Sequence, residues 1–331
     1  MRTVVIGASG YSGGELLRLL AGHPDFEVMA ISAHSNAGED VMAIHPFLHS
    51  YSGRKFIDVG SINWNEIDFA FLALPHGESA KIAQEIPQNV KIVDLGADFR
   101  LEDPLMWKKY YGGDHSGTWT YGLPELFREQ IVVQKRVANP GCYATAITLS
   151  IAPMSEYIEN DIVVVAASGT TGAGRSAKIN LLGSEVMGSL TTYKFGGVHQ
   201  HTPEIEQALK NATGIDPKIS FTPILAPMPR GILATISAKL TKAISTEEAH
   251  EFFSRFFKNE DCVTVLPLGQ MPQTSAVYGT NRVHIQVACD ARTQRITIST
   301  AIDNLGKGAA GQAIQNANLM CGFPENTGLS A

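Results

Sequence analysis

The chain has 331 residues, of which 44% are hydrophobic and 18% are charged, and its formal net charge is −6. This composition excludes a disordered or collagen-like chain, and the length indicates about two domains. The acidic balance excludes a typical duplex nucleic-acid binder, and the apolar stretches are too short to span a bilayer. The four cysteines form no CxxC pair, which indicates free thiols in a reducing compartment. The first residues enter a strand-like run at once, so we expect no targeting segment and a cytoplasmic location.

The first third of the chain alternates strand and helix signals. Apolar runs predict strands at residues 3–6, 27–31, 69–74 and 91–95, and helical spacing predicts helices at 14–20 and 79–85. Short apolar strands that alternate with helices are typical of a doubly wound parallel sheet. Residues 100–135 are richer in aromatics, glycine and charge, and we expect loops there with one or two short helices.

The pattern changes after residue 151. Strands are predicted at 162–167, 219–223, 231–240, 283–288 and 295–302, with a helix at 246–257 and a final helix at 308–320. Several strands with few helices indicate an open, mixed or mostly antiparallel sheet. The second part of the chain is therefore predicted to be an α+β domain.

A glycine-rich loop follows the first predicted strand and opens the first helix. Its sequence, GASGYSG at residues 7–13, has the spacing GxxGxxG rather than the commoner GxGxxG. Glycines permit a tight turn and a close approach of the backbone, and the helix N-terminus attracts a pyrophosphate. The alternative is an ordinary glycine-rich turn. We predict a dinucleotide site with contacts from Gly7, Ser9, Gly10, Tyr11, Ser12 and Gly13.

The end of the second predicted strand bears on which nucleotide binds. A site that prefers NAD usually places a carboxylate there, about 20 residues after the glycine loop. Here the strand runs into Ser32 and Ser35, with His34 between them and no acid before Glu39. Hydroxyls suit a 2′-phosphate better than a carboxylate would, because like charges repel. We therefore predict NADP(H), the alternative being a loose preference.

Cys142 is the candidate nucleophile. Pro140 and Gly141 force a turn, and the predicted helix at 144–151 places Cys142 at its N-terminus. A helix N-terminus stabilises a thiolate over a thiol, and a thiolate attacks acyl carbons. The alternative is a buried core thiol, which is the commoner fate of a free cysteine. The remaining cysteines lack this setting and are interpreted as ordinary residues: Cys262, Cys289 and Cys321.

Two histidines precede a helix predicted at 205–209 and are candidates for the acid or base partner. His199 and His201 are separated by one residue, and we expect Thr202 to cap the helix with Pro203 as its first residue. Two histidines in a loop could also bind a metal, but further ligands are not evident nearby, so no metal site is predicted.

Further motifs run in order along nearly the whole chain. They are LPHG at 74–77, DLGADFR at 94–100, YGLPEL at 121–126, NPGCYAT at 139–145, SGTTGAGR at 168–175, HQHTPE at 199–204 and DNLGKGAAGQAIQNAN at 303–318. Together with the opening GASGYSG, they resemble the N-acetyl-gamma-glutamyl-phosphate reductases, a family similar in plan to aspartate-semialdehyde dehydrogenase. Two departures are Gly96, where the family often has serine, and Gln200, at a position that is often basic. We expect the Gly96 change to be tolerated by the backbone.

The resemblance implies a fold and a reaction. The fold is α/β, with a Rossmann-like NADP-binding domain (residues 1–141 plus 308–331) and an inserted α+β catalytic and dimerisation domain (residues 142–307). The last helix is expected to pack on the nucleotide domain after a turn at 306–308. The implied reaction belongs to arginine biosynthesis: NADPH-dependent reduction of an acyl phosphate to a semialdehyde through a Cys142 thioester, with inorganic phosphate released.

Roles for further residues follow from the resemblance and from the charge of the substrate. His201 is implied as the acid, with His199 as the alternative. Arg100 is our candidate for the phosphate, since a guanidinium matches it bidentately, and a surface arginine paired with Asp98 or Glu102 is the alternative. Arg175 and Lys194 are weaker candidates for an anion. The expected substrate contacts are Ser168, Gly169 and Tyr193, and the further expected cofactor contacts are Pro75, Gly172 and Asn304.

An open sheet would leave a face to cover, so we expect a homo-oligomer, either a dimer or a tetramer. Two rival functions stay open at this point. One is a related semialdehyde dehydrogenase that acts on aspartyl phosphate, or on the carrier-linked or aminoadipyl analogue of lysine synthesis. The other is a non-enzymatic NAD(P) sensor, which would keep the glycine loop and lose the cysteine and histidine pair.

Overall fold

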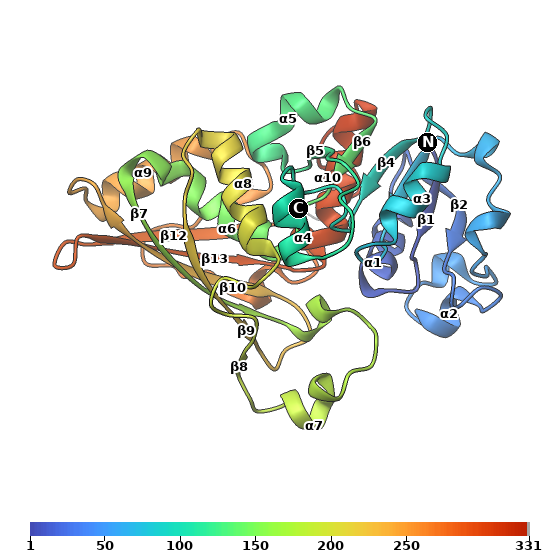
Figure 1. Ribbon diagram of the computed structural model, residues 1–331, viewed down its shortest axis with the longest axis horizontal. Helices are drawn as coiled ribbons and strands as arrows, with labels where there is room; N and C mark the ends of the chain where they lie inside the picture. Colours follow the sequence, from blue (N-terminus) through green and yellow to red (C-terminus); the bar gives the residue numbers. More distant parts are fainter. Residues whose placement is uncertain (330–331) are drawn as a thin grey trace. The chain divides into compact units, whose positions relative to one another are not determined.

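The computed structural model describes residues 1–329, and in this part of the chain the strands form a six-stranded and a seven-stranded sheet (Figure 1). Each sheet belongs to its own unit. Of the described residues, 1–140 and 309–329 make up unit 1, and 141–308 make up unit 2. None of the helices in the described residues combines the length and apolar character that a membrane crossing requires.

Unit 1 is built on a parallel sheet with the strand order β2-β1-β3-β4-β6-β5. Its central strands are made of β-branched and aromatic residues, and the side chains of β3 are fully buried. The strands are β1 (Arg2–Ile6), β2 (Glu27–Ser32), β3 (Phe69–Leu72), β4 (Lys91–Asp94), β5 (Thr120–Tyr121) and β6 (Arg136–Ala138). The doubly wound parallel sheet predicted from the sequence is therefore confirmed.

The helices of unit 1 are α1 (Tyr11–Leu20), α2 (Val41–Ile44), α3 (Ser79–Glu85), α4 (Pro104–Tyr110), α5 (Pro124–Val132) and α10 (Gly311–Cys321). The last of these, α10, returns from the end of the chain and packs against α5 and β4. Gln312 and Asn316 of α10 both donate side-chain hydrogen bonds to the carbonyl of Gly122. These buried amides fix the register of α10 against the loop before α5.

Unit 2 contains a mixed sheet with the order β11-β12-β13-β10-β7-β9-β8. The strands are β7 (Ile158–Ser168), β8 (Thr191–Thr192), β9 (Ile219–Leu225), β10 (Ile232–Leu240), β11 (Val263–Val265), β12 (Val283–Asp290) and β13 (Arg295–Ile302). The helices are α6 (Cys142–Ile151), α7 (Gly183–Val186), α8 (His201–Thr213) and α9 (Thr246–Phe256). This confirms the predicted α+β class.

One face of the unit 2 sheet is covered by α6, α8 and α9 (Figure 1). Along β10 the residues that face these helices, Ile232, Ala234, Ile236 and Ala238, are fully buried. The alternate face is more open, because Val163 and Val165 of β7 are 38% and 41% exposed. The period of two along these strands matches a sheet with one face buried.

The segment before α10 differs from the expected turn. Residues Gly306–Ala310 form a π-helical segment that leads into α10. Gly306 lies against the backbone of Thr280, since a Cβ placed on it would be 2.1 Å from that carbonyl oxygen. Glycine is required for this close approach, and the two glycines at 306 and 308 therefore serve packing rather than a turn.

Candidate active site

The glycine loop of unit 1 joins β1 to α1 and is shaped by close backbone contacts. Gly7 has φ +79°, and a Cβ on it would lie 2.3 Å from the carbonyl oxygen of Ala73. A Cβ on Gly13 would lie 2.6 Å from the Cα of Ala8. Gly10 is the N-cap of α1 and caps it without a side chain. The loop therefore presents a helix N-terminus with no side chain over it, which fits the pyrophosphate of a dinucleotide.

The loop lies at the point where the strand order of the sheet reverses, because β1 is flanked by β2 and β3. Ligands of open α/β sheets bind outside the carboxyl ends of the strands at such a switch point. Pro75 follows β3 at this edge and is exposed, two residues after the Ala73 that contacts Gly7. The structure thus brings together the predicted cofactor residues of the glycine loop and Pro75.

A carboxylate that sequence reasoning missed lies beside the end of β2. Ser32 is fully buried and pairs in a parallel bridge with Ile57, which places Asp58 beside His34. The Asp58 carboxylate and the Nδ1 of His34 are 3.4 Å apart. A hydrogen bond from the amide of Gly60, followed by the His34 contact, lowers the pKa of Asp58. Ser35 is exposed, and its hydroxyl donates to Asn36.

Arg100 is buried in unit 1 and is only 6% exposed. Its Nε donates to the carbonyl of Asn139 and its Nη2 to the carbonyl of Leu95, each over 2.8 Å. The neighbouring Asp98 accepts hydrogen bonds from the amides of Gly77 and Ala80. The guanidinium is therefore fixed to backbone near the carboxyl end of β4, instead of standing on the surface.

Cys142 is the first residue of α6 and belongs to unit 2. Gly141, the N-cap, offers no side chain to the helix amides. Gly308 lies directly against Cys142, since a Cβ on it would be 2.7 Å from the Cβ of the cysteine. The cysteine is partly exposed, so its sulfur is accessible at a helix N-terminus, the position that favours a thiolate.

His201 packs on the residue that precedes Cys142. A Cβ on Gly141 would lie 2.4 Å from the Nε2 of His201, so only glycine fits there. The amide of Gly141 donates a 2.7 Å hydrogen bond to Glu204, which is fully buried on the same helix as His201. His201 and Glu204, three residues apart on α8, therefore both contact Gly141.

His199 has a different position and a different state. Its Nδ1 accepts from the amide of His201 over 3.1 Å, and its carbonyl accepts from the amide of Thr202. Burial, then the charges of His201 and Lys194, lowers the pKa of His199 to about 2. His199 is consequently neutral at physiological pH, and it accepts the first two amides of α8.

The expectation that Thr202 caps this helix is wrong. The helix begins at His201 with Gln200 as its N-cap, and the buried Thr202 hydroxyl makes no hydrogen bond. The reason is that His199 already accepts the amides of His201 and Thr202, the first two of α8, so the Thr202 hydroxyl is not needed as their acceptor.

Aromatic rings surround the two histidines. Tyr143 contacts both imidazoles, and the hydroxyl of Tyr193 donates to that of Tyr143 over 3.0 Å. Phe221 packs on Tyr143 and His199. Burial is the largest cause that raises the pKa of both tyrosines, that of Tyr193 to about 12. Both tyrosines therefore keep their protons at neutral pH.

The small-residue loop after β7 is held by backbone contacts. Ser168 is buried, and Gly169 lies against Pro229 and Arg230, where a Cβ would be 2.8 Å away. Asn304 accepts from the amide of Gly231 and donates to the hydroxyl of Thr171. A Cβ on Gly172 would lie 3.4 Å from the Ser168 hydroxyl and 3.9 Å from the Asn304 amide nitrogen. Within unit 2, the predicted residues Ser168, Gly169, Gly172 and Asn304 are thus neighbours.

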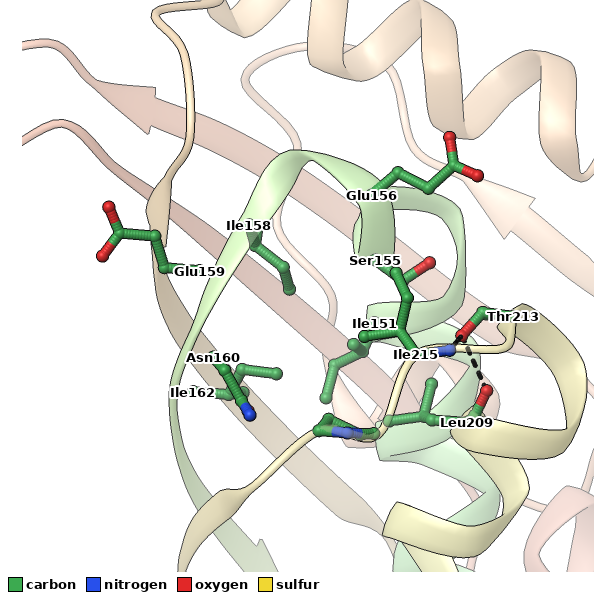
Figure 2. A pocket seen from close by; sticks show the side chains of 11 residues that line it. Ile151, Ser155, Glu156, Ile158, Glu159, Asn160, Ile162, Leu209, Thr213 and Ile215 are labelled. Carbon is green, nitrogen blue, oxygen red and sulfur yellow. Dashed lines mark hydrogen bonds between the residues drawn. The ribbon is translucent and has the colours of Figure 1, made fainter.

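A separate cavity of about 190 Å³ lies elsewhere in unit 2, between the end of α6, the start of β7 and the end of α8 (Figure 2). Its wall is largely aliphatic: Ile151, Ile158, Ile162, Leu209, Ile215 and Pro217. No candidate catalytic residue lines it. The cavity has the apolar character common in binding pockets, but it is not the site of Cys142.

Comparisons with known proteins match both parts of the chain. Residues 2–134 match the family described as semialdehyde dehydrogenase, NAD binding domain, and residues 142–304 match semialdehyde dehydrogenase, dimerisation domain. N-acetyl-gamma-glutamyl-phosphate reductase from Acidothermus cellulolyticus is 53% identical over 99% of this chain and 97% of its own. The enzymes of that name from Frankia casuarinae and Streptomyces avermitilis are 53% and 50% identical, over 99% and 100% of this chain and 97% and 98% of theirs.

Solved structures share the fold at low sequence identity. Aspartate semialdehyde dehydrogenase II from Vibrio cholerae, complexed with ASA, superposes with a TM-score of 0.75 at 16% identity, over 97% of this chain and 98% of the other. Aspartate semialdehyde dehydrogenase with NADP from Candida albicans gives a TM-score of 0.70 at 16% identity, with the same coverage.

Proposed function

The chain belongs to the N-acetyl-gamma-glutamyl-phosphate reductase family of the semialdehyde dehydrogenases, and we propose that it catalyses the reaction of that name in arginine biosynthesis. The substrate is N-acetyl-L-glutamyl 5-phosphate, the reductant is NADPH, and the products are N-acetyl-L-glutamate 5-semialdehyde and phosphate. One observation supports this chemistry above the others: Cys142 begins α6 while His201 packs on the glycine before it.

The cofactor is NADP, held by the glycine loop of unit 1. Gly7, Ser9, Gly10, Tyr11, Ser12 and Gly13 bind the pyrophosphate, Ser32 and Ser35 serve the adenosine end, and Pro75, Gly172 and Asn304 complete the contacts. The helix N-terminus of α1 and the absence of a capping side chain support this assignment. When bound, NADPH supplies the hydride that reduces the acyl group to an aldehyde.

The reaction begins with attack of the Cys142 thiolate on the acyl carbon. The new C–S bond replaces the C–O bond to phosphate, and phosphate leaves with that electron pair. The resulting thioester accepts a hydride far more readily than a carboxylate does. After reduction the C–S bond breaks, which releases the aldehyde and restores the thiolate. The amides at the N-terminus of α6 stabilise the oxyanion that forms at each stage.

His201 is the general acid and base of this sequence. It holds a proton near the reacting oxygen and returns it as the thioester forms and collapses, which contributes roughly 10²–10⁴ to the rate. His199 is the weaker choice, since its Nδ1 is engaged with the amide of His201 and its pKa is lowered to about 2. At neutral pH the imidazole of His199 is uncharged. Its Nδ1 carries no proton to donate, because that nitrogen accepts the amide of His201.

Charged and polar groups orient the substrate. Arg100 binds the phosphate through its guanidinium. The guanidinium has a fixed orientation, because it donates to the backbone carbonyls of Asn139 and Leu95. Ser168, Gly169 and Tyr193 contact the acyl group. The chain of hydroxyls from Tyr193 to Tyr143, the residue after the nucleophile, supports this role for Tyr193.

The two parts of the chain divide these tasks. Residues 1–141 with 308–331 form the NADP-binding domain, and residues 142–307 form the catalytic and oligomerisation domain. The match to a dimerisation domain indicates a homo-oligomer, which we propose to be a dimer or a tetramer. The open face of the unit 2 sheet, with Val163 and Val165 exposed, supports burial against a second copy. We further propose that the enzyme is cytoplasmic.

The decisive experiment measures NADP reduction in the reverse direction with N-acetylglutamate semialdehyde and phosphate. Turnover should require phosphate, and Cys142→Ala should abolish it while NADP binding stays intact. A thiol reagent should label Cys142 first, and substrate should protect it. Turnover of aspartate semialdehyde in preference to the acetylated substrate would refute the proposal, as would activity in the Cys142→Ala variant.

A further inference from the structure

The segment between β8 and α8 holds a lysine in an unusual backbone conformation. Lys194 has φ +43°, and among the described residues the other non-glycine residue with a positive φ is Gln294. The left-handed region is unfavourable for a residue with a Cβ, and such strain persists only where the surroundings impose it. Gln294 lies in the tight connection between β12 and β13, where turns commonly require this conformation. Lys194 lies beside the candidate active site.

Lys194 and its chain neighbour Tyr193 each hydrogen-bond to a residue next to the candidate catalytic residues. Its Nζ donates a 2.7 Å hydrogen bond to Oε1 of Gln200, the N-cap of α8, which lies between His199 and His201. Its chain neighbour Tyr193 donates to Tyr143, the residue after Cys142. The ammonium is therefore held at the N-terminus of α8, the helix that begins with His201.

This region carries positive charge that no carboxylate neutralises among the described residues. Neither Lys194 nor the nearby Lys178 forms an ion pair there, and the hydrogen-bond partner of Lys194 is a neutral amide. Burial, then the charge of Lys178, lowers the pKa of Lys194. The charge of Lys194 in turn contributes to the lowered pKa of His199. Two lysines whose charges act on each other, with no ion-pair partner for either, favour binding of an anion.

We propose that Lys194 binds the α-carboxylate of the substrate and is a specificity-determining residue of the reaction, an inference that rests on the proposed function. The acyl substrate carries two anionic groups, and only the carboxylate remains on the semialdehyde after phosphate has left. A lysine ammonium has three N–H donors, and the Gln200 contact uses one of them. The other two can bind a carboxylate at the far end of the acyl chain while Cys142 engages the carbonyl.

The test uses Lys194→Gly, because glycine adopts the same φ without strain and lacks the ammonium. The reverse reaction is followed with N-acetylglutamate semialdehyde and with 4-acetamidobutanal, which is the same aldehyde without the carboxylate. For the first aldehyde, we expect the KM of the variant to rise by roughly 10-fold or more, the range of a lost charge-assisted hydrogen bond. The kcat and the KM values for phosphate and NADP should stay within about twofold. For 4-acetamidobutanal, the kcat/KM of wild type and variant should be equal.

Two further variants keep the result interpretable. Lys194→Met repeats the test if the glycine variant is poorly folded, and Lys210→Met, an exposed lysine near the other end of α8, is the matched control that should match wild type. An equal loss with both aldehydes would overturn the proposal in favour of a structural role. A selective rise in the KM for phosphate or NADP would overturn it in favour of phosphate binding. Absence of wild-type turnover with N-acetylglutamate semialdehyde would instead overturn the proposed function, and this inference with it.

Discussion

The backbone amide of Gly141 donates a 2.7 Å hydrogen bond to the carboxylate of Glu204. The bond joins the N-terminus of α6, which carries Cys142, to the N-terminus of α8, which carries His201. Glu204 is fully buried, and His201 lies against the same glycine. Within unit 2, this bond and the packing of His201 on Gly141 therefore help to set the position of the thiol relative to the imidazole.

Replacing Glu204 should impair catalysis by misplacing His201. Glu204→Ala removes the acceptor and should lower kcat by roughly 10- to 100-fold, because a hydrogen bond to a charged group contributes about 1.5–3 kcal/mol. Glu204→Gln keeps an oxygen acceptor and should recover much of that loss. Steady-state kinetics and NADP titration of both variants test this, with the NADP affinity expected to stay constant. If the alanine variant kept the wild-type kcat, the contact would not position the site.

The two histidines should differ sharply on substitution. His201→Asn should lower kcat by roughly 10²–10⁴, the range for loss of a general acid–base group. His199→Asn should be mild, because the asparagine oxygen can accept the amide of His201 as Nδ1 now does. Since the pKa of His199 is lowered to about 2, no ionisation of His199 should appear in the kcat profile between pH 5 and 9. A missing basic or acidic limb in the His199→Asn profile would contradict this assignment.

Local signals predicted the elements that carry the site. The strands at 162–167 and 295–302 and the helix at 79–85 are found within a few residues of their predicted bounds, because their apolar periodicity is strong. Cys142 was predicted at a helix N-terminus since Pro140 and Gly141 force a turn, and it is the first residue of α6. By contrast β5 and β6, of two and three residues, are too short to give a pattern.

Contacts that depend on tertiary structure were not predictable. Gly308 touches Cys142 although 166 residues separate them (308 − 142), and Glu204 reaches Gly141 from another helix. The spacing of Glu204 three residues after His201 was the available signal, since it places both on one helical face. The surroundings of Gly96, where the family often has serine, also depend on tertiary contacts. A Cβ there would lie 2.6 Å from the hydroxyl of Ser79, so a serine would require Ser79 to move.

The position of Asp58 beside His34 predicts that a substitution of Asp58 changes the preference for NADP over NAD. Asp58 lies beside the end of β2, because Ile57 pairs with Ser32, and the sequence shows no acid between that strand and Glu39. Its carboxylate repels a 2′-phosphate, so Asp58→Asn should raise the kcat/KM ratio of NADP over NAD by several-fold. The kinetics with each cofactor at constant ionic strength measure this. Glu66→Gln, another acid of unit 1, is the control, and an unchanged ratio in Asp58→Asn would place the nucleotide away from this pair.

Asp94 should make the stability of unit 1 depend on pH. The side chain is fully buried at the end of β4, and its Oδ1 accepts from the hydroxyl of Ser79 and the amide of Gly96. Burial raises the pKa of Asp94 to about 6, against a usual value of 3.8. The folded state therefore binds this proton more tightly than the unfolded state, so its contribution to stability falls as the pH rises from about 4 to 6 and stays low above that.

Removing this carboxylate should stabilise the protein at neutral pH and above. Two units of pKa correspond to about 3 kcal/mol, so Asp94→Asn should raise the free energy of unfolding at pH 8 by up to that amount. The asparagine places an N–H₂ group where Oδ2 of Asp94 has no hydrogen-bond partner, and the cost of burying that group reduces the gain. The gain should vanish near pH 4, where the wild-type carboxyl is protonated. Thermal unfolding at both pH values measures the difference. Asp68→Asn should change stability in the opposite sense at pH 8, because Arg2 lowers the pKa of Asp68. A gain for Asp94→Asn that is equal at pH 4 and pH 8 would show that packing, and not the buried charge, sets the stability at this position.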